Sequence, residues 1–248
     1  MSYDPMESFE VRKIISIDVF GIDLSITNSS VFMMLVVGMV CGALWLGTSK
    51  SDIVPTKFQV IIEKLFFFSG EITKSNFGNN SVLIFPYVTA LFLFIMIGNV
   101  VGLFPFAFSF TSQLIVTIGM ASAVFFASIA IGIRTQGIRY FRHFCPAGVP
   151  SYLVPFFLVI ESMSFLFRPI SLGVRLFANM VAGHIMIKVI SGFAVSLSGM
   201  KCWAWMAILP ISVNVLLNVF KLAVCVLQAY VFVMLSCMYL SESMEVSA

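Results

Sequence analysis

The chain has 248 residues, of which 60% are hydrophobic and only 10% are charged. Soluble domains carry about 25% charged residues, so the composition excludes a soluble globular protein and favours an all-α integral membrane protein. The net charge of +3 is small and the basic residues are scattered, so we expect no nucleic-acid-binding surface. The five cysteines lack metal-ligand spacing and the chain contains no catalytic motif, so we expect no metal, cofactor or bond chemistry.

The first 29 residues are polar and acidic, and we expect them to lie at the membrane surface. The cluster 27–30 (TNSS) consists of helix N-cap residues followed by an apolar run. A first membrane span is therefore predicted over 30–48.

The next part of the chain mixes an interfacial segment with two spans. Residues 55–77 place apolar side chains at helical spacing among lysines and glutamates. This segment is too charged to cross a membrane, so we predict an interfacial amphipathic helix. Further spans are predicted over 82–104, which contains Pro86 and Asn99, and over 112–133.

Two long apolar segments follow, over 150–190 and 203–240. Each has about 40 residues, where about 20 suffice to cross a membrane. Polar residues continue along both, so we expect a strongly tilted helical hairpin, and all five spans in one domain of 248 residues. The basic loops 49–81 and 134–149 are predicted to face the cytoplasm or matrix, and the loop 104–111 to face the outer side.

The first long segment carries a polar stripe. A charge at the bilayer centre costs about 2.5–3.5 kcal/mol or more, so such residues are expected only where they perform a task. Steps of three and four residues place them on one helix face. The stripe extends about 21 Å from its glutamate to its second arginine, which indicates a path for an ion. Its members are Glu161, Ser164, Arg168, Ser171, Arg175 and Asn179.

The last segment carries a second stripe at steps of four, three, four and three residues. Two helices of one hairpin can bury such faces against each other or against a partner. This stripe consists of Asn214, Asn218, Lys221, Cys225 and Gln228.

Plainer roles stay open for some of these residues. Arg168 could extend its charge to lipid headgroups, or pair with Glu161 seven residues earlier. Asn214 and Asn218 are expected to hydrogen-bond between helices rather than to carry protons.

Four stretches resemble subunit a of F-type rotary ATP synthases, in its alphaproteobacterial and mitochondrial branch. The similarity spans nearly the whole chain in the family's order, and the opening stretches SFEVRKII and DLSITNSSVFM are similar to that branch too. The four stretches are NVVGLFPFAFSFTSQLIVT at 99–117, FCPAGVPSYLVPFFLVIES at 144–162, FRPISLGVRLFANMVAGH at 167–184 and VLQAYVFVMLSCMYL at 226–240.

The resemblance implies a non-catalytic subunit with two offset half-channels that load and unload protons on the carboxylates of a c-ring. Proton transport is thereby coupled to ATP synthesis. The implied partners are the c subunits, b-type peripheral stalk subunits, the remaining synthase subunits and membrane lipid. The implied location is an energy-coupling membrane: a bacterial inner membrane, which the N-terminal segment favours, or a mitochondrial inner membrane.

The resemblance also implies residue roles. Arg175 matches the family's essential arginine, whose guanidinium cannot lose its proton; it attracts each c-ring carboxylate and blocks leakage between the half-channels. Asn179 and Gln228 match positions near that arginine. Glu161 matches an acidic residue of the inner half-channel, and His184 matches a titratable residue of the outer one.

Lys221 departs from the family pattern, which usually has Glu or His seven residues before Gln228. A lysine relays protons only if it loses its charge near neutral pH, far from its ordinary pKa of about 10.4. Lys221 could instead pair with an acidic group of a partner, or the outer path could depend on His184 and water. Ser171 and Asn218 are further candidates.

Two other functions compete with this interpretation. A secondary transporter usually contains inverted repeats, but comparison of 30–133 with 150–240 reveals none. A non-conducting membrane scaffold would not require an arginine and a glutamate on one buried helical stripe.

Overall fold

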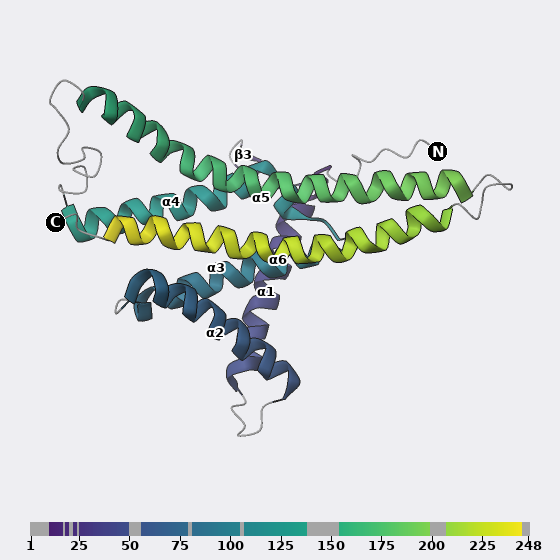
Figure 1. Ribbon diagram of the computed structural model, residues 1–248, viewed down its shortest axis with the longest axis horizontal. Helices are drawn as coiled ribbons and strands as arrows, with labels where there is room; N and C mark the ends of the chain where they lie inside the picture. Colours follow the sequence, from purple (N-terminus) through teal and green to yellow (C-terminus); the bar gives the residue numbers. More distant parts are fainter. Residues whose placement is uncertain are drawn as a thin grey trace.

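The computed structural model describes residues 10–16, 18–19, 22–23, 25–49, 56–78, 81–104, 107–137, 154–198 and 207–244. Five helices in this part of the chain are long and apolar enough to cross a membrane. The expected all-α membrane fold is confirmed. Figure 1 shows two long helices side by side along the molecule, with a third running across them.

The N-terminal segment forms a small nested hairpin. Strand β1 (Lys13–Ile15) pairs antiparallel with β4 (Ile26–Thr27), and β2 (Asp18–Val19) pairs antiparallel with β3 (Ile22–Asp23). The side chains of β1 are exposed. These strands were not predicted, although apolar and polar residues alternate here with the period of a strand.

Helix α1 (Asn28–Ser49) begins at the predicted cluster of capping residues. The backbone N–H of Ser30 donates to Thr27 Oγ1 at 3.4 Å, which satisfies one of the free donors of the first turn. Its window Asn28–Trp45 is apolar enough to span a membrane. In Figure 1, α1 runs across the direction of the long helices.

Helix α2 (Lys57–Phe77) has local signals at both ends. Thr56 Oγ1 accepts a hydrogen bond from the backbone N–H of Gln59 at 3.4 Å. At the other end Gly78 adopts a φ of 51°, and its N–H donates to the carbonyl of Lys74. Glycine tolerates this left-handed conformation without strain. Helix α2 carries charged, exposed residues along its length, as an interfacial helix does.

Helices α3 (Ser81–Val101) and α4 (Leu114–Gln136) are joined by a connection that contains the short 3₁₀ helix η3 (Phe110–Ser112). This connection packs back onto α3. A Cβ at Gly98 would lie only 2.5 Å from Cζ of Phe110, so the absence of a side chain there admits the ring.

Helices α5 (Val154–Ser198) and α6 (Ile208–Met244) have 45 and 37 residues. At ~1.5 Å per residue they are about 68 and 56 Å long, against a hydrocarbon thickness of about 30 Å. Unbroken helices of this length fit the membrane only when strongly tilted. Helix α5 also curves (Figure 1) and contains Pro169, a common cause of helix bending.

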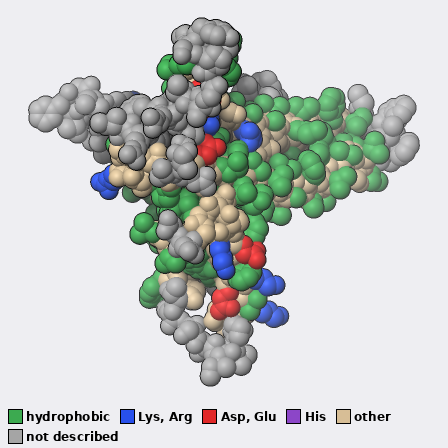
Figure 2. Space-filling view, turned by 60° about the vertical axis from the view of Figure 1, so that its left-hand side comes forward, with side chains coloured by type: hydrophobic (Ala, Val, Ile, Leu, Met, Phe, Trp, Pro, Cys, Tyr) green, Lys and Arg blue, Asp and Glu red, His purple; other side chains and the backbone are tan. Residues whose placement is uncertain are grey.

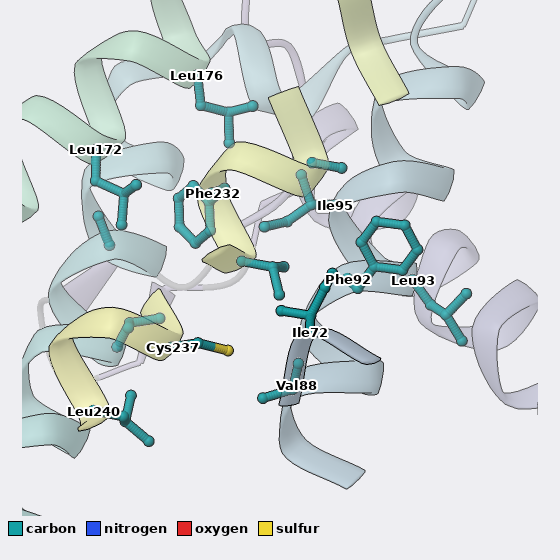
Figure 3. Packing of buried hydrophobic residues seen from close by; sticks show 14 of the residues in the cluster. Ile72, Val88, Phe92, Leu93, Ile95, Leu172, Leu176, Phe232, Cys237 and Leu240 are labelled. Atoms are coloured by element: carbon teal, nitrogen blue, oxygen red, sulfur yellow. The ribbon is translucent and has the colours of Figure 1, made fainter. Parts of the chain in front are cut away.

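The core lies where α3 to α6 meet, at the end of the hairpin away from its loop. Phe92 and Ile95 of α3, Leu176 of α5 and Phe232 of α6 are essentially inaccessible and belong to one cluster (Figure 3). Only 6% of the span of α5 is buried, compared with 39% for the spans of α3 and α6. Hydrophobic side chains cover the arm built from the loop-side halves of α5 and α6 (Figure 2). This arm therefore presents its apolar surface to lipid or to partner chains.

Helices α4 and α5 approach each other closely at Gly173. A Cβ at this position would lie 2.9 Å from Cα of Ile118 and 3.0 Å from the carbonyl oxygen of Thr117. Because both atoms belong to the backbone of α4, they cannot rotate away as a flexible side chain can. Gly173 thus fixes the distance between α5 and the rest of the bundle.

We expect Gly173→Val to destabilise the protein by roughly 1–3 kcal/mol, the usual cost of overpacking. Gly192→Val is the matched control, because it lies on the same helix and a Cβ there meets nothing within 4 Å. Thermal unfolding of the detergent-solubilised assembly, followed by the loss of this subunit, measures both variants. Equal midpoints would contradict the close helix approach.

Candidate functional site

One ion cluster joins α5 and α6. Arg168 Nη1 donates a hydrogen bond to Glu242 Oε2, and Arg168 Nη2 lies 3.9 Å from Glu161 Oε1. The guanidinium carbon of Arg168 lies 5.8 Å from the ring centroid of Phe165 and 5.3 Å from that of Tyr239. The Arg168 side chain is 21% exposed. Of the two plainer roles considered for Arg168, pairing with Glu161 is therefore the one observed.

The cluster lies at the end of the hairpin where α4 terminates. Gln136 Nε2 of α4 donates to the carbonyl of Ser243 at 3.0 Å. From α2, the carbonyl of Asn76 accepts a hydrogen bond from Ser241 Oγ at 2.9 Å. The basic loop 134–149 begins at this end of α4, so the loop charges predict that the cluster faces the inner side.

Arg175 lies on an exposed face of α5, as does Ser171 one turn before it. No Asp or Glu among the described residues forms an ion pair with Arg175. Tyr239 of α6 lies within its electrostatic range. Arg175 therefore presents a positive charge without an acidic partner in the described part of the chain, on an exposed helix surface.

A cavity of about 190 Å³ opens between α5 and α6 beyond Arg175. Its polar lining is Asn179 and Lys221, and the rest is apolar. Lys221 is 7% exposed, and its Nζ has no hydrogen-bond partner among the described residues. The aliphatic part of the Lys221 side chain lies against Gly183, where a Cβ would be 2.8 Å from Cε of Lys221. His184 is half-buried beside this cavity, with Lys221 and Lys188 as the cations that act on it.

Further polar atoms are buried near the middle of α6. Asn99 Nδ2 of α3 donates to the carbonyl of Cys225 at 3.4 Å. Asn99 Oδ1 and Gln228 Nε2 are buried and lack partners within the described part of the chain. Buried polar atoms are normally satisfied by protein or by ordered water. This interface is therefore suited to hold water inside an apolar protein.

Near the loop that joins them, α5 and α6 are linked by a hydrogen bond between side chains. Asn214 Nδ2 donates to Ser191 Oγ of α5 at 2.8 Å, as expected for a residue that joins two helices. Asn218 differs from this expectation. It is exposed, and its Nδ2 donates at 2.9 Å to the carbonyl of Asn214 on its own helix.

These contacts fix the antiparallel register of α5 and α6. Arg168 of α5 lies opposite Glu242 of α6, and Gly183 of α5 lies opposite Lys221. Arg175 then lies about 10 Å along the axis from Arg168 and about 12 Å from Gly183. The polar groups thus form two clusters along the hairpin, with Arg175 between them. One is the ion cluster around Arg168, and the other is the group around the cavity lined by Asn179 and Lys221.

Sequence patterns identified most polar residues of the site but missed Glu242. Those identified are Glu161, Arg168, Arg175, Asn179, His184, Lys221 and Gln228. Glu242 follows Gln228 by fourteen residues, which is close to four helical turns and keeps it on the same face. That spacing could have revealed it. Among the described residues, no three His, Cys, Asp or Glu side chains gather so as to hold a metal ion.

The fold and the polar hairpin define a class: a multi-pass membrane protein whose ionisable groups follow two tilted helices, as in proteins that move ions. Comparison with known proteins identifies the family. The family model described as ATP synthase A chain matches residues 30–241.

Relatives named ATP synthase subunit a align with almost the entire chain. One from Sinorhizobium medicae is 44% identical over 99% of this chain and 98% of its own length. One from Brucella canis is 41% identical over 99% of each chain. One from Rhodospirillum rubrum is 38% identical over 98% of this chain and 99% of its own.

The chain belongs to the ATP synthase A chain family, and the predicted resemblance is confirmed. It is the proton-translocating stator subunit, which catalyses no reaction by itself and works within the ATP synthase complex. It is a multi-pass protein of an energy-coupling membrane.

Asn214→Ala should destabilise the loop end of the hairpin by roughly 0.5–1 kcal/mol, the usual contribution of a hydrogen bond between membrane helices. Asn218→Ala is the matched control, because its bond does not leave α6. Proteolysis rates at the loop between the two helices, measured in membranes, compare the variants. Faster cleavage of the Asn218 variant would contradict the assigned contact.

Proposed function

We propose that Arg175 faces the proton-carrying carboxylates of a c-ring and separates two half-channels of this subunit. The observation that carries the proposal is the position of Arg175: exposed on α5, without an acidic partner in the described part of the chain, and between two polar clusters. An unpaired guanidinium in a membrane is costly. A carboxylate supplied by a partner would offset that cost.

The inner half-channel is assigned to Glu161 and the ion cluster around it. Glu161 is partly exposed, so water can reach it, and it lies at the end of the hairpin that the loop charges assign to the inner side. A carboxylate in contact with water can accept a proton from the ring side and release it.

The outer half-channel is assigned to His184, Asn179 and Gln228, with Lys221 beside them. Asn179 and Lys221 line one cavity, and His184 lies next to it. Gln228 Nε2 of α6 is buried and has no hydrogen-bond partner among the described residues. Polar groups around a cavity can hold the water through which a proton moves.

Arg175 lies in the gap between the two groups, so a proton can cross only on a carrier that passes the arginine. Because the guanidinium keeps its proton at all physiological pH values, it repels free protons and attracts each ionised carboxylate. Ser171 and Asn218 are both exposed, and they would border the ring rather than line a path.

The exposed face of α5 is the docking surface proposed for the c-ring, and b-type stalk subunits would cover another part of the apolar surface. The relatives reported above are bacterial. This favours a bacterial inner membrane over a mitochondrial one.

Arg175→Ala should abolish proton-driven ATP synthesis, reducing it at least about 100-fold, because no fixed charge would then draw protons from the carrier. Passive proton leak should rise, since the seal between the half-channels is lost. Both are measured in membrane vesicles that contain the assembled complex. Arg134→Gln is the matched control: it removes an exposed arginine at the end of α4. Normal synthesis by Arg175→Ala would contradict the proposal.

Lys221→Glu should keep ATP synthesis within about 3-fold of the unaltered chain, whereas Lys221→Met should lower it about 10-fold or more. The reason is that the outer path needs a group at this position that exchanges protons or orders water. Synthesis rates in the same vesicles provide the comparison, normalised to assembled complex. Full activity of Lys221→Met would remove Lys221 from the outer path.

A further inference from the structure

The cluster at the inner end contains one cation and two carboxylates from different helices. Arg168 reaches Glu242 of α6 with one guanidinium nitrogen and Glu161 of α5 with the other. Glu161 and Glu242 are 36% and 39% exposed, so both can contact water. Tyr239 and Phe165 flank the guanidinium. The site is thus built around Arg168 rather than around either carboxylate.

The planar fork of an arginine suits this geometry. It presents several N–H donors in a rigid plane and can hold two carboxylates at once, which the ammonium of a lysine does less well. The two flanking aromatic rings are within the range of cation–π contacts and limit the positions that the guanidinium can take. Arg168 therefore stays between Glu161 and Glu242.

The net charge of the cluster depends on Arg168. With Arg168 present, the three groups carry one net negative charge. Without it, two carboxylates would remain at the site, and no other cation among the described residues forms an ion pair with them. Repulsion between two carboxylates at one site favours the retention of a proton there. The nearest other cation in the stripe, Arg175, lies about 10 Å along the helix and is exposed on the outer surface of α5.

We infer that Arg168 is a positioning residue for proton release: it holds Glu161 and Glu242 as one site with a single net negative charge at the inner end of the hairpin. A proton that arrives at Glu161 then passes to water rather than staying between two carboxylates. Glu242 acts as the second anchor of Arg168 and not as an obligatory carrier. This inference rests on the assignment of Glu161 to the inner half-channel.

The test compares ATP synthesis by the assembled complex in vesicles for Arg168→Gln, Arg168→Lys, Glu242→Gln and the double variant Arg168→Gln/Glu242→Gln. Arg134→Gln is the control for loss of an arginine at the same end of the molecule. The amount of assembled complex is measured for every variant. Arg175→Ala is measured in parallel, because its synthesis rate tests the proposed function independently.

We expect Arg168→Gln to lower synthesis per assembled complex about 10-fold and Arg168→Lys to recover most of it, since lysine restores the charge but not the fork. The decisive comparison is between the double variant and Arg168→Gln. The double variant restores the net charge of the cluster while removing one more contact, so it should be several-fold faster than Arg168→Gln alone.

A purely structural role predicts the opposite order, since the double variant has lost more contacts. A double variant no faster than Arg168→Gln would therefore overturn the inference, as would full activity of Arg168→Gln. If Arg168→Gln fails to assemble, assembly becomes the readout: recovery in the double variant supports the charge balance, and failure of both variants overturns it. If Arg175→Ala synthesises ATP normally, the proposed function fails, whatever the order of the Arg168 variants.

Discussion

Charged groups in the hydrocarbon region have no bulk water to solvate them, so each must find a partner or a wet cavity. This constraint organises the whole hairpin. Arg168 meets it within the chain, through Glu161 and Glu242. Lys221 lies against a cavity large enough for several waters. Arg175 alone among these three has neither in the described part of the chain, which makes it the position where the structure requires a partner.

The packing of the bundle supports that distribution of charges. Helices α3 and α4 cover only the half of α6 that begins at Lys221, where buried residues recur every three or four positions. The glycine contact at Gly173 brings α4 against α5 just before Arg175. One side of the hairpin is therefore held rigidly while the opposite side of α5 stays uncovered. A fixed backbone keeps Arg175 at a constant height, as the proposed contact with moving carboxylates would require, and a loose loop could not do so.

Sequence patterns predicted the membrane class, the interfacial helix and both polar stripes, because apolar run length and helical periodicity are local properties. They did not predict the N-terminal strands, which have only two or three residues each. They also missed Glu242. Its spacing from Gln228 places it on the face of the second stripe, but its contact with Arg168 spans 74 residues of sequence, and such a contact depends on long-range packing that no local pattern encodes. For the same reason Asn214 and Asn218, alike in sequence, differ in the structure: only Asn214 faces α5.

The tilt expected of the hairpin explains why the two proposed half-channels on one pair of helices would need a moving carrier between them. If α5, about 68 Å long, lies within a hydrocarbon layer of about 30 Å, its axis is far from the membrane normal. The clusters at Arg168 and Gly183 are about 22 Å apart along that axis. At such a tilt, the two clusters are separated by about 10 Å along the membrane normal and by about 20 Å parallel to the membrane plane, within the ~30 Å layer. Most of the distance between the two sites therefore runs parallel to the membrane. A proton could cover it only by being carried sideways past Arg175, a motion that a rotating ring of carboxylates would supply and a static pore would not.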